Sequence, residues 1–540
     1  MKSHCLPFNQ IPHTARLFTD FLSYTPKVQQ FYPHSPRFNE WFREEASSID
    51  YDPERRAKVS AVLERQNKAW NVSAKALQNI ERLRRGAAAV VSGQQVGLFG
   101  GTSFSLFKAL TAAKLAEQAT SAGVDCVPVF WLATDDHDLA EINHVTIPAP
   151  NGSPHRLNAP TQGLPDAPVG TIKLGSEIES VVAEAAELLG DSDISILLRD
   201  AYKSGETFGS AYARLFATLF AEWGVILLDA SDPEIHELAG PILRSAIEKS
   251  AQLGEGLLAR GKEIESAGYH QQVKVTPSST LLFAIQNGSR TPVHRRTNAT
   301  TGDEEFLIGE EKISKADLLK RIDSSPGDFS ANVLLRPVVQ DYLLPTITYA
   351  GGAAEIAYFA QAGAVYEALL DRVTPIVMRF SATLVESKPQ SLLEKYALDL
   401  IDVFRGPEAL RAELAARTLS AKVQDSFEKA ASLLNKSLSG IRESLEQLDK
   451  TLIDAANNAE SKMQYQLDQL RSRAARAELR HSEVIGRHAE ILSNLLYPNK
   501  GLQEREIAGI YFVAHHGNEL LRNLYQMVNA DCLDHQVVFL

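Results

Sequence analysis

Cysteines and basic residues are few in this chain. Its 540 residues include three cysteines, Cys5, Cys126 and Cys532, which lie far apart and never at a CxxC spacing. A disulfide framework is therefore not expected, and a reducing compartment is favoured. Lys and Arg number 55 against 67 Asp and Glu, the formal net charge is −12, and no basic patch stands out. We therefore do not expect nucleic acid to be the main partner.

Long apolar runs and the commonest catalytic motifs are also missing. No uncharged apolar run is long enough to span a bilayer. The first ten residues (MKSHCLPFNQ) lack the apolar segment of a signal peptide. We expect a cytoplasmic protein without a membrane partner. The motifs GxSxG and HExxH and the EF-hand loop are absent too, so the sequence carries no signature of the enzymes and calcium proteins that use them.

The composition that remains is that of a folded protein with several units. Hydrophobic residues make up 44% and charged residues 23%, and the length suggests roughly three or four units. Turn signals at Asn287-Gly288 and Thr301-Gly302 indicate short antiparallel strands. The expected units are a mostly helical segment that packs on the core (1–85), an α/β core (86–383) with insertions near 148–222 and 250–330, a helical coiled-coil hairpin (384–498) and a tail that returns to the core (499–540).

Residues 87–143 predict a parallel β-α-β unit. An apolar run ends in a glycine-rich loop (92–101, SGQQVGLFGG), a helical stretch follows, and a second apolar run (127–133) ends in the acidic loop TDDHD. The helix carries Leu106 and Leu110 towards the sheet and places Lys108 on another face. A third buried strand is expected at 223–229, leading into a helix with Pro233 at its first position. Ligands bind at the carboxyl ends of strands in such sheets, so the pattern indicates an enzyme.

Beyond residue 384 the apolar spacing changes. From Phe427 to Leu452 apolar residues follow one another at intervals of four and three, which is an a/d seam of more than three heptads. Asn457-Asn458 is the expected turn, and a second, more charged helix runs on towards Pro498. The simplest structure is an antiparallel helical hairpin that serves as a dimer contact.

The glycine-rich loop is the candidate anion site. Gly93 and Gly97 let the backbone approach a ligand closely, and the following helix N-terminus favours phosphate or carboxylate. The loop matches neither the Walker P-loop nor a clean dinucleotide fingerprint. A tight strand-to-helix turn without a ligand is the alternative, although the adjacent Gln94 and Gln95 are unusual there. Gly351, after a later strand, suits close ligand approach in the same way.

The acidic loop is the candidate for acid–base chemistry. Asp136 and His137 stand at the strand end, where they could exchange protons or organise a divalent cation. For Asp138 and Glu141, an acidic helix N-terminus explains the pattern equally well.

Two arginines are candidates for anion binding. Arg336 lies among apolar neighbours and needs a partner, either a substrate carboxylate or phosphate or, in a structural role, Asp341 or Glu355. Arg379 could clamp an anion or pair with Asp371.

Several of these stretches together resemble one family. The stretches are SGQQVGL (92–98), PVFWLATDDHD (128–138) with EIN (141–143), LRP (335–337) with Gln340 and Glu355, and the terminal HQVV (535–538). They resemble the BshC family, the cysteine ligases of bacillithiol biosynthesis, and the resemblance extends over essentially the whole chain. It implies a Rossmann-like, nucleotidyl-transferase-like core with inserted elements and a coiled coil that supports a homodimer.

The resemblance also implies an activity. The family joins the carboxyl group of L-cysteine to the amino group of glucosaminyl malate in the last step of bacillithiol synthesis. Amide formation from a free carboxylate is uphill in water, so ATP is expected, with Mg²⁺ as its companion ion. The His-x-Gly-His signature of nucleotidyl-transferases is absent, and Gly93-Gln94-Gln95 stands in its place.

On this hypothesis the site residues take three roles, and no protein-bound metal is assigned. Asp136 and His137 are catalytic; Gly93, Gln94, Gln95, Gly97 and Gly351 bind nucleotide phosphates; Arg336, Gln340, Glu355, Tyr358 and Arg379 bind substrate. Two alternatives from other classes remain. One is a metal-dependent hydrolase that uses Asp135–Asp138, and the other is a coiled-coil assembly protein that merely binds a nucleotide.

Overall fold

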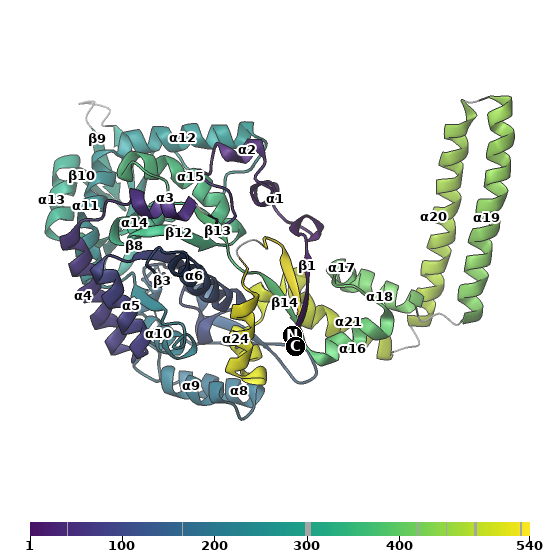
Figure 1. The fold of residues 1–540 in the computed structure, drawn as a ribbon, viewed down its shortest axis with the longest axis horizontal. Coiled ribbons are helices and arrows are strands. Elements are labelled where there is room, and N and C mark those ends of the chain that lie inside the picture. The colour runs from purple at the N-terminus through teal and green to yellow at the C-terminus, as the bar shows by residue number, and fades with distance from the viewer. Residues whose placement is uncertain are drawn as a thin grey trace.

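The structure is a computed structural model that describes residues 1–39, 41–161, 163–164, 166–297, 304–417, 421–449, 451–479, 483–529 and 532–540. A body built around a parallel sheet carries a long helical hairpin that projects from one side (Figure 1). None of the helices in the described segments combines the length and hydropathy needed to cross a membrane.

A five-stranded parallel sheet forms the core, in the order β13-β12-β2-β3-β6. Its strands are β2 (Ala88–Gln94), β3 (Cys126–Leu132), β6 (Ile226–Asp229), β12 (Thr346–Gly351) and β13 (Ile376–Met378). The first of these strands along the chain lies in the middle, and the chain extends the sheet first to one side and then to the other. This is the doubly wound order of a Rossmann-like sheet, with its topological switch between β2 and β12. The predicted α/β class is confirmed.

Helices cover both faces of this sheet, which explains why its strands are apolar throughout. On one face Val91 and Val129 pack with Ile356 of α15 (Ala353–Leu370). On the other face Phe130 packs with Leu110 of α6 (Ser103–Ser121). Cys126, at the start of β3, is a buried free thiol.

The prediction that Lys108 lies on an outward face of its helix is wrong. Lys108 is only 3% exposed. Helix α6 contacts β2 and β3 and, elsewhere, three C-terminal helices. At Lys108 the helix faces the carboxyl end of β2, where Nζ donates to the Gly93 carbonyl at 2.8 Å. A lysine buried in this way needs polar partners. The three C-terminal helices are α22 (Gln503–Glu506), α23 (Gly509–His516) and α24 (Asn518–Met527).

The N-terminal segment begins with a strand and continues as helices that pack on the core. Its elements are β1 (Lys2–Leu6), α1 (Arg16–Leu22), α2 (Pro26–Gln29), α3 (Trp41–Ser48), α4 (Pro53–Ala69) and α5 (Ala74–Arg85). The expectation of a mostly helical segment missed β1, because a strand is defined by its partner, and this partner lies at the other end of the chain.

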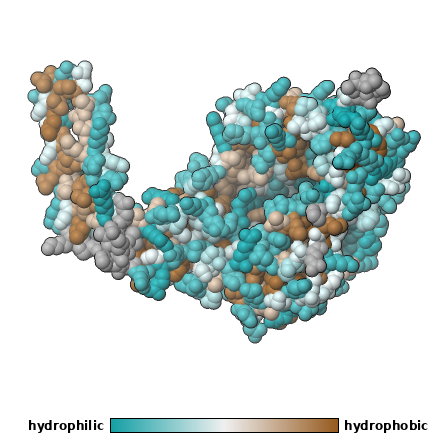
Figure 2. Space-filling model, turned by 180° about the vertical axis from the view of Figure 1, so that it is seen from behind, coloured by the Kyte–Doolittle hydropathy of each residue, from teal (hydrophilic) through white to brown (hydrophobic). Residues whose placement is uncertain are grey.

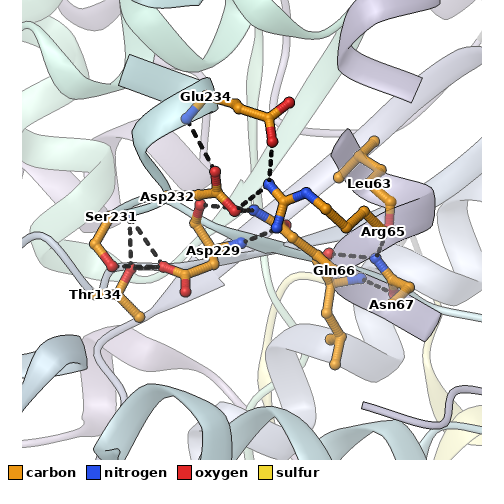
Figure 3. Close-up of polar contacts among 10 residues, drawn as sticks. Leu63, Arg65, Gln66, Asn67, Thr134, Asp229, Ser231, Asp232 and Glu234 are labelled. Carbon is orange, nitrogen blue, oxygen red and sulfur yellow. Dashed lines mark hydrogen bonds and ion pairs between the residues drawn. The ribbon is translucent and has the colours of Figure 1, made fainter. Parts of the chain in front are cut away.

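Helix α4 is fastened to the end of β6 by side-chain hydrogen bonds (Figure 3). Asn67 receives the Leu227 N–H at 3.0 Å and donates to the Leu227 carbonyl at 2.7 Å. Beyond the strand, Asp232 caps the helix that starts at Pro233, as the sequence predicts, and Arg65 pairs with Asp232 at 2.7 Å. These bonds hold the outermost strand of the sheet against α4.

Two insertions interrupt the core. The first contains α7 (Leu139–Ile142), β4 (His144–Pro148), β5 (Pro154–Asn158), α8 (Ile178–Leu189), α9 (Asp193–Ala201) and α10 (Phe208–Leu219). The second contains α11 (Pro233–Glu248), α12 (Ser250–Ser266), β7 (Ser279–Gln286), β8 (Ser289–Thr297), β9 (Glu304–Ile308), β10 (Glu311–Ser314), α13 (Lys315–Ser324) and β11 (Phe329–Ala331), and α14 (Arg336–Leu343) leads back to the core.

Strands β7–β11 form an antiparallel sheet in the order β10-β9-β8-β7-β11. The predicted turn at Asn287-Gly288 joins β7 and β8, and both residues have positive φ, 53° and 82°, as a tight hairpin turn requires. The other predicted turn, Thr301-Gly302, lies outside the described residues.

A small sheet brings the two chain ends together. Strand β15 (His535–Phe539) pairs antiparallel with β1 and parallel with β14 (Ala382–Val385), and both termini lie side by side (Figure 1). The C-terminal residues therefore pack against the segment that leaves the last core strand.

The projecting hairpin consists of two 28-residue helices, α19 (Ala421–Leu448) and α20 (Leu452–Leu479). The predicted turn at Asn457-Asn458 is wrong, because both residues lie inside α20. The chain turns instead around Asp449, which accepts hydrogen bonds from the N–H and hydroxyl of Thr451. The short helices at its base are α16 (Ser387–Tyr396), α17 (Leu400–Phe404), α18 (Pro407–Arg417) and α21 (Glu483–Leu496).

Candidate functional site

A cavity of about 830 Å³ opens at the carboxyl ends of β2, β3 and β12, beside the topological switch point where Rossmann-like sheets bind ligands. Most of the predicted site residues line it, namely Gly93, Gln94, Gln95, Asp136, His137, Arg336, Glu355, Tyr358 and Arg379. Gly97, Gln340 and Gly351 are not among its lining residues. Most of the residues predicted for the site therefore lie at one cavity, and several of them make contacts that the sequence did not predict.

The glycine-rich loop divides into two parts. Gly93 lines the cavity, and a Cβ there would lie 2.6 Å from the Trp131 carbonyl oxygen, so close strand packing requires this glycine. The segment from Gly97 onwards turns inwards, and Leu98 and Phe99 are fully buried. Gly97 therefore belongs to the tight turn that leads into α6, where a Cβ would lie 3.1 Å from Gly101 Cα.

The N-terminus of α6, the predicted phosphate cradle, is closed by the chain itself. Both the N–H and the hydroxyl of Ser103 donate to the Ile507 carbonyl at 2.9 Å. The Gly101 carbonyl accepts a hydrogen bond from Gly509. Helix N-termini bind anions through free N–H groups. Here the carbonyl of Ile507, from the C-terminal part of the chain, already accepts the N–H of the first helical residue, Ser103.

The two glutamines of the loop hold other side chains. Gln95 donates to Asp136 Oδ2 at 2.7 Å and to Glu141 Oε2 at 2.9 Å. Gln94 Oε1 accepts a hydrogen bond from Lys108 Nζ at 2.8 Å. Their presence in a turn is explained by these contacts with charged groups of the cavity wall.

Asp136 is a strongly ionised carboxylate. Burial alone would raise its pKa, but hydrogen bonds from His137 and Gln95 and the charge of Arg290 outweigh burial and lower the pKa to about 2. A carboxylate with so low a pKa is a weak base and a good acceptor for an ammonium group or N–H donors.

The tautomer of His137 is set by an arginine. Arg290 Nη1 lies 3.0 Å from His137 Nδ1, and a guanidinium only donates hydrogen bonds. Asp136 Oδ1 lies farther from the same nitrogen, at 3.4 Å. The closer contact with Arg290 favours an accepting Nδ1, and in the neutral ring Nε2 then carries the hydrogen. His137 then offers the cavity an N–H donor.

Arg290 was not found from the sequence. It lies on β8 of the second insertion, is 8% exposed, and also donates to Ser330 Oγ and the Ala331 carbonyl. Its guanidinium packs over the Phe283 ring at 4.3 Å. No motif marks it, because its place in the site depends on how the inserted sheet folds over the core.

A buried ion pair forms the floor of the cavity. Lys108 Nζ donates to Glu355 Oε2 at 2.7 Å and to the Gly93 carbonyl at 2.8 Å. Burial lowers the pKa of Lys108 to about 8, and Glu355 opposes that shift. The Glu355 carboxylate also accepts the Tyr349 hydroxyl at 2.6 Å and the Gly352 N–H at 2.8 Å. With three donors around it, Glu355 holds the cavity wall together.

Arg336 pairs with neither of the two acids predicted for its structural role. It donates to the Tyr358 hydroxyl at 2.7 Å and to Gln340 Oε1 at 3.2 Å. Gln340 is fully buried and donates to Asp341. Gln340 therefore acts behind the wall, where it orients Arg336.

Arg379 is joined to the C-terminal tail rather than to Asp371. Its Nη2 donates to Glu504 Oε1 at 2.6 Å, and both side chains are almost completely buried. Glu504 Oε2 also accepts from the Ser381 hydroxyl and the Ala382 N–H. Glu504 of the C-terminal tail thus balances the charge of Arg379, which lines the cavity.

His535 of β15 continues this network. Its Nδ1 lies 2.7 Å from the Ser381 hydroxyl, and its Nε2 lies 2.8 Å from the Thr383 hydroxyl. Burial lowers the pKa of His535 to about 4, so the ring is neutral at pH 7. The last strand of the chain is therefore fixed to the residues that support the site.

The acidic loop does not assemble a set of metal ligands from the protein alone. Asp138 is the N-cap of α7 and accepts the Glu141 N–H at 3.1 Å. Within the described segments no group of three or more His, Cys, Asp or Glu side chains is placed to hold a metal ion. This geometry gives the alternative of a metal-dependent hydrolase no support.

Fold and site define a class of protein: a Rossmann-like α/β enzyme with a charged cavity at the sheet's carboxyl edge and an appended coiled coil. Comparison with known protein families then identifies the family to which the chain belongs. Residues 1–380 match the family model of the bacillithiol biosynthesis BshC N-terminal Rossmann-like domain, and residues 382–540 match that of its C-terminal coiled-coil domain. The chain belongs to the BshC family and is an enzyme of the ligase class.

Curated relatives agree over the full length. The chain is 46% identical to a protein of Koribacter versatilis over 99% of both chains, and 35% identical to one of Solibacter usitatus over 100% of both. A third, from Salinibacter ruber, is 33% identical over 97% of this chain and 96% of the relative. All three carry the name "Putative cysteine ligase BshC".

Proposed function

We propose that this protein joins the carboxyl group of L-cysteine to the amino group of glucosaminyl malate and uses ATP to activate the carboxyl group. The observation that carries the proposal is the presence of charged groups of both signs in one cavity. Asp135, Asp136 and Glu141 line it together with Lys108, Arg336 and Arg379. The substrates of such a ligation carry both amino and carboxylate groups, so a cavity with walls of both signs suits them.

The carboxylate of Asp136 suits the amino group of glucosaminyl malate. Asp136 is ionised throughout the physiological range, since its pKa is about 2, and its oxygens lie at the cavity. It would hold the sugar amine by charge and hydrogen bonding. The Nε2–H of His137, fixed by Arg290, would donate to the oxygen that gains charge when the amine attacks the activated carboxyl carbon.

ATP would supply the activation that a free carboxylate lacks. The loop after β2 fits its phosphates poorly, because the N-terminus of α6 is closed by the Ile507 carbonyl. The first turn of α15 is the other candidate, since Gly352 and Ala354 line the cavity, and there the N–H groups that follow Gly352 would meet the phosphates, because the Gly352 N–H donates to Glu355. Gly93, Gln94 and Gln95 would then border the nucleotide, and Gly351 would support the turn from behind.

The hairpin would form a homodimer. Apolar side chains are exposed along both of its helices, and Figure 2 shows them as brown atoms on the projecting arm. Leu433, Ile441 and Leu448 of α19 are 50–77% exposed, and Met463 and Leu470 of α20 are 47–56% exposed. An apolar surface of this kind on a projecting arm suits a second copy of the chain.

The test is a reaction of the purified protein with L-cysteine, glucosaminyl malate, ATP and Mg²⁺, followed by mass spectrometry. Formation of bacillithiol with AMP supports an acyl-adenylate, and formation with ADP supports an acyl-phosphate. We expect His137→Ala to lose most of the activity, while His155→Ala, an exposed histidine paired with Glu184, keeps it. Absence of bacillithiol with all four components present would contradict the proposal.

A further inference from the structure

One cation at the cavity, Arg505, makes no direct ion pair within the described residues. Arg505, the third residue of α22, lines the cavity. Across the described ranges, no hydrogen bond or ion pair joins its guanidinium to another side chain. The surrounding protein atoms, and then the charge of Arg379, lower the pKa of Arg505, and the charges of Glu504, Glu355 and Glu506 oppose this shift without cancelling it. An anion bound at the guanidinium would add to that compensation.

The residues before Arg505 hold it in place. Gln503 is 2% exposed, and its side chain accepts the Leu384 N–H at 2.7 Å and donates to the Leu384 carbonyl at 2.8 Å. Glu504 is fixed by its pair with Arg379. Since two consecutive side chains anchor α22 in the interior, the backbone of Arg505 is positioned before any ligand arrives. Such preorganisation favours binding of a charged group.

A second, independent feature points to the same place. Arg379 is 4% exposed, and its Nε has no hydrogen-bond partner although both Nη atoms are used. This Nε lies 3.3 Å from the position that a Cβ on Gly352 would take. Gly352 is the N-cap of the 18-residue helix α15, and its own N–H already donates to Glu355 Oε2 at 2.8 Å. The N–H groups of the following residues of the first turn and the free Nε share one corner of the cavity.

We propose that Arg505, Arg379 Nε and the first turn of α15 form an anion subsite, in which Arg505 binds an oxyanion of the substrates. The naming of that oxyanion rests on the proposed function: it is either a malyl carboxylate or a phosphate of ATP. The C-terminal domain thereby contributes a binding residue to the Rossmann-like cavity, and the cavity is incomplete without it.

Direct binding tests this subsite without relying on the ligase reaction. L-malate, inorganic phosphate and ATP with Mg²⁺ are titrated separately into the whole protein by calorimetry. We expect Arg505→Ala to weaken one class of ligand by on the order of tenfold or more, since a hydrogen bond to a charged group is lost. Arg505→Lys should retain part of the affinity. Arg487→Ala, an exposed arginine of α21, is the matched control and should change nothing.

The outcomes separate the two sources. A loss for malate alone assigns the carboxylate, and a loss for phosphate and ATP assigns the nucleotide. Unchanged affinity for all three ligands in Arg505→Ala, or no binding of any of them to the wild type, would overturn the subsite. If no bacillithiol forms but malate binding depends on Arg505, the ligase proposal fails and the subsite stands.

A different observation concerns two cysteines that the sequence separates by almost the whole chain. The sulfur atoms of Cys5 and Cys532 lie 3.4 Å apart. Pairing of β1 with β15, in which Cys5 faces Gln536, brings them together. Cys5 is exposed and Cys532 is partly exposed, so a small oxidant can reach the pair. Burial and the neighbouring sulfur raise the pKa of Cys5 to about 11, so Cys5 is a thiol at neutral pH.

We infer that Cys5 and Cys532 are an oxidisable pair that takes a low-molecular-weight disulfide as its oxidant. One thiolate attacks the small disulfide, which forms a mixed disulfide and releases one small thiol. The second cysteine then attacks the protein sulfur of the mixed disulfide and releases the other small thiol. The net reaction converts two protein thiols and one disulfide into one protein disulfide and two small thiols, and it ties the two chain ends together.

Intact-mass measurement tests this pair. Incubation of the native protein with oxidised glutathione should lower its mass by about 2 Da, the loss of two hydrogens in disulfide formation, and dithiothreitol should reverse the change. Cys5→Ser should prevent the change, while Cys126→Ser, a buried cysteine, should not. Unchanged mass, or a glutathione adduct that persists on the wild-type protein, would overturn the inference.

Discussion

The cavity and the hairpin handle charge and apolar surface in opposite ways. In the cavity, Lys108, Glu355 and Arg379 are buried, and each is held by at least two polar partners. In the hairpin the charged residues face water, and apolar side chains such as Leu448, 77% exposed, do so as well. The first arrangement fixes geometry for small charged ligands. The second leaves an apolar surface exposed to solvent.

The comparison also separates two sources of stability. Removal of either member of a buried ion pair lowers the free energy of unfolding strongly, because it leaves an uncompensated charge in the interior. An exposed apolar or charged residue contributes little to the fold of its own chain. Substitutions in the two regions should therefore differ sharply in their effect on folding.

The largest effect is expected for Glu504→Gln. The change leaves Arg379 buried without its counter-charge, so the free energy of unfolding should fall by about 3–5 kcal/mol. Chemical denaturation at pH 7 measures it. The matched control is Glu490→Gln, which removes a pair with Arg411 that is about half exposed on both sides and should cost less than about 1 kcal/mol. Equal effects of the two changes would remove the distinction between interior and surface pairs.

The next effect is a pH dependence carried by His535. Its folded pKa is about 4 against 6.5 for the free side chain, so the unfolded chain binds a proton that the folded chain does not. Stability from this group is present above pH 6.5 and is lost as the pH falls towards 4, by about 3 kcal/mol in total. His535→Gln should lose correspondingly less stability between pH 7 and pH 4. Denaturation curves of both proteins at several pH values measure this, and parallel pH profiles would contradict it.

The sequence predicted the parts of the fold that local patterns determine. The β-α-β unit follows from apolar runs of strand length that end in glycine or acidic loops, and the helix at Pro233 follows from its cap. The seam from Phe427 to Leu452 predicted long helices but not their turn. A turn depends on where two helices stop pairing, and an Asn-Asn pair inside a helix costs only a few tenths of a kcal/mol per residue.

The candidate site was predictable where its residues follow core strands, as Asp136 and His137 do. Arg290 and Arg505 could not be found in this way, because each comes from a segment that reaches the cavity only after the whole chain has folded. The role of Lys108 was hidden for another reason. The amphipathic rule assigns a charged residue to an exposed helix face, whereas Lys108 faces the carboxyl end of β2 and is held there by Gly93 and Glu355.

A smaller effect is expected for Gln95→Ala at the cavity. Removal of the hydrogen bonds to Asp136 and Glu141 should cost about 1 kcal/mol of unfolding free energy at pH 7 and should raise the pKa of Asp136. Chemical denaturation gives the first quantity. Gln390→Ala, which removes a hydrogen bond to the exposed Glu394, is the control and should cost less. If Gln390→Ala lowered the unfolding free energy more than Gln95→Ala does, the hydrogen bonds of Gln95 to the cavity carboxylates would not contribute the expected stability.

The smallest effect on folding, and the sharpest test of the hairpin, is expected for Ile441→Glu combined with Leu448→Glu. Both side chains are at least half exposed, so the body's unfolding free energy should change by less than about 0.5 kcal/mol per site. The proposed dimer should nevertheless dissociate, because two carboxylates would have to be buried in its apolar interface. Sedimentation velocity would show a monomer, with Glu443→Lys as an exposed control that stays dimeric. A wild-type monomer, or a double variant that remains dimeric, would mean that the apolar surface of the hairpin is not the dimer contact.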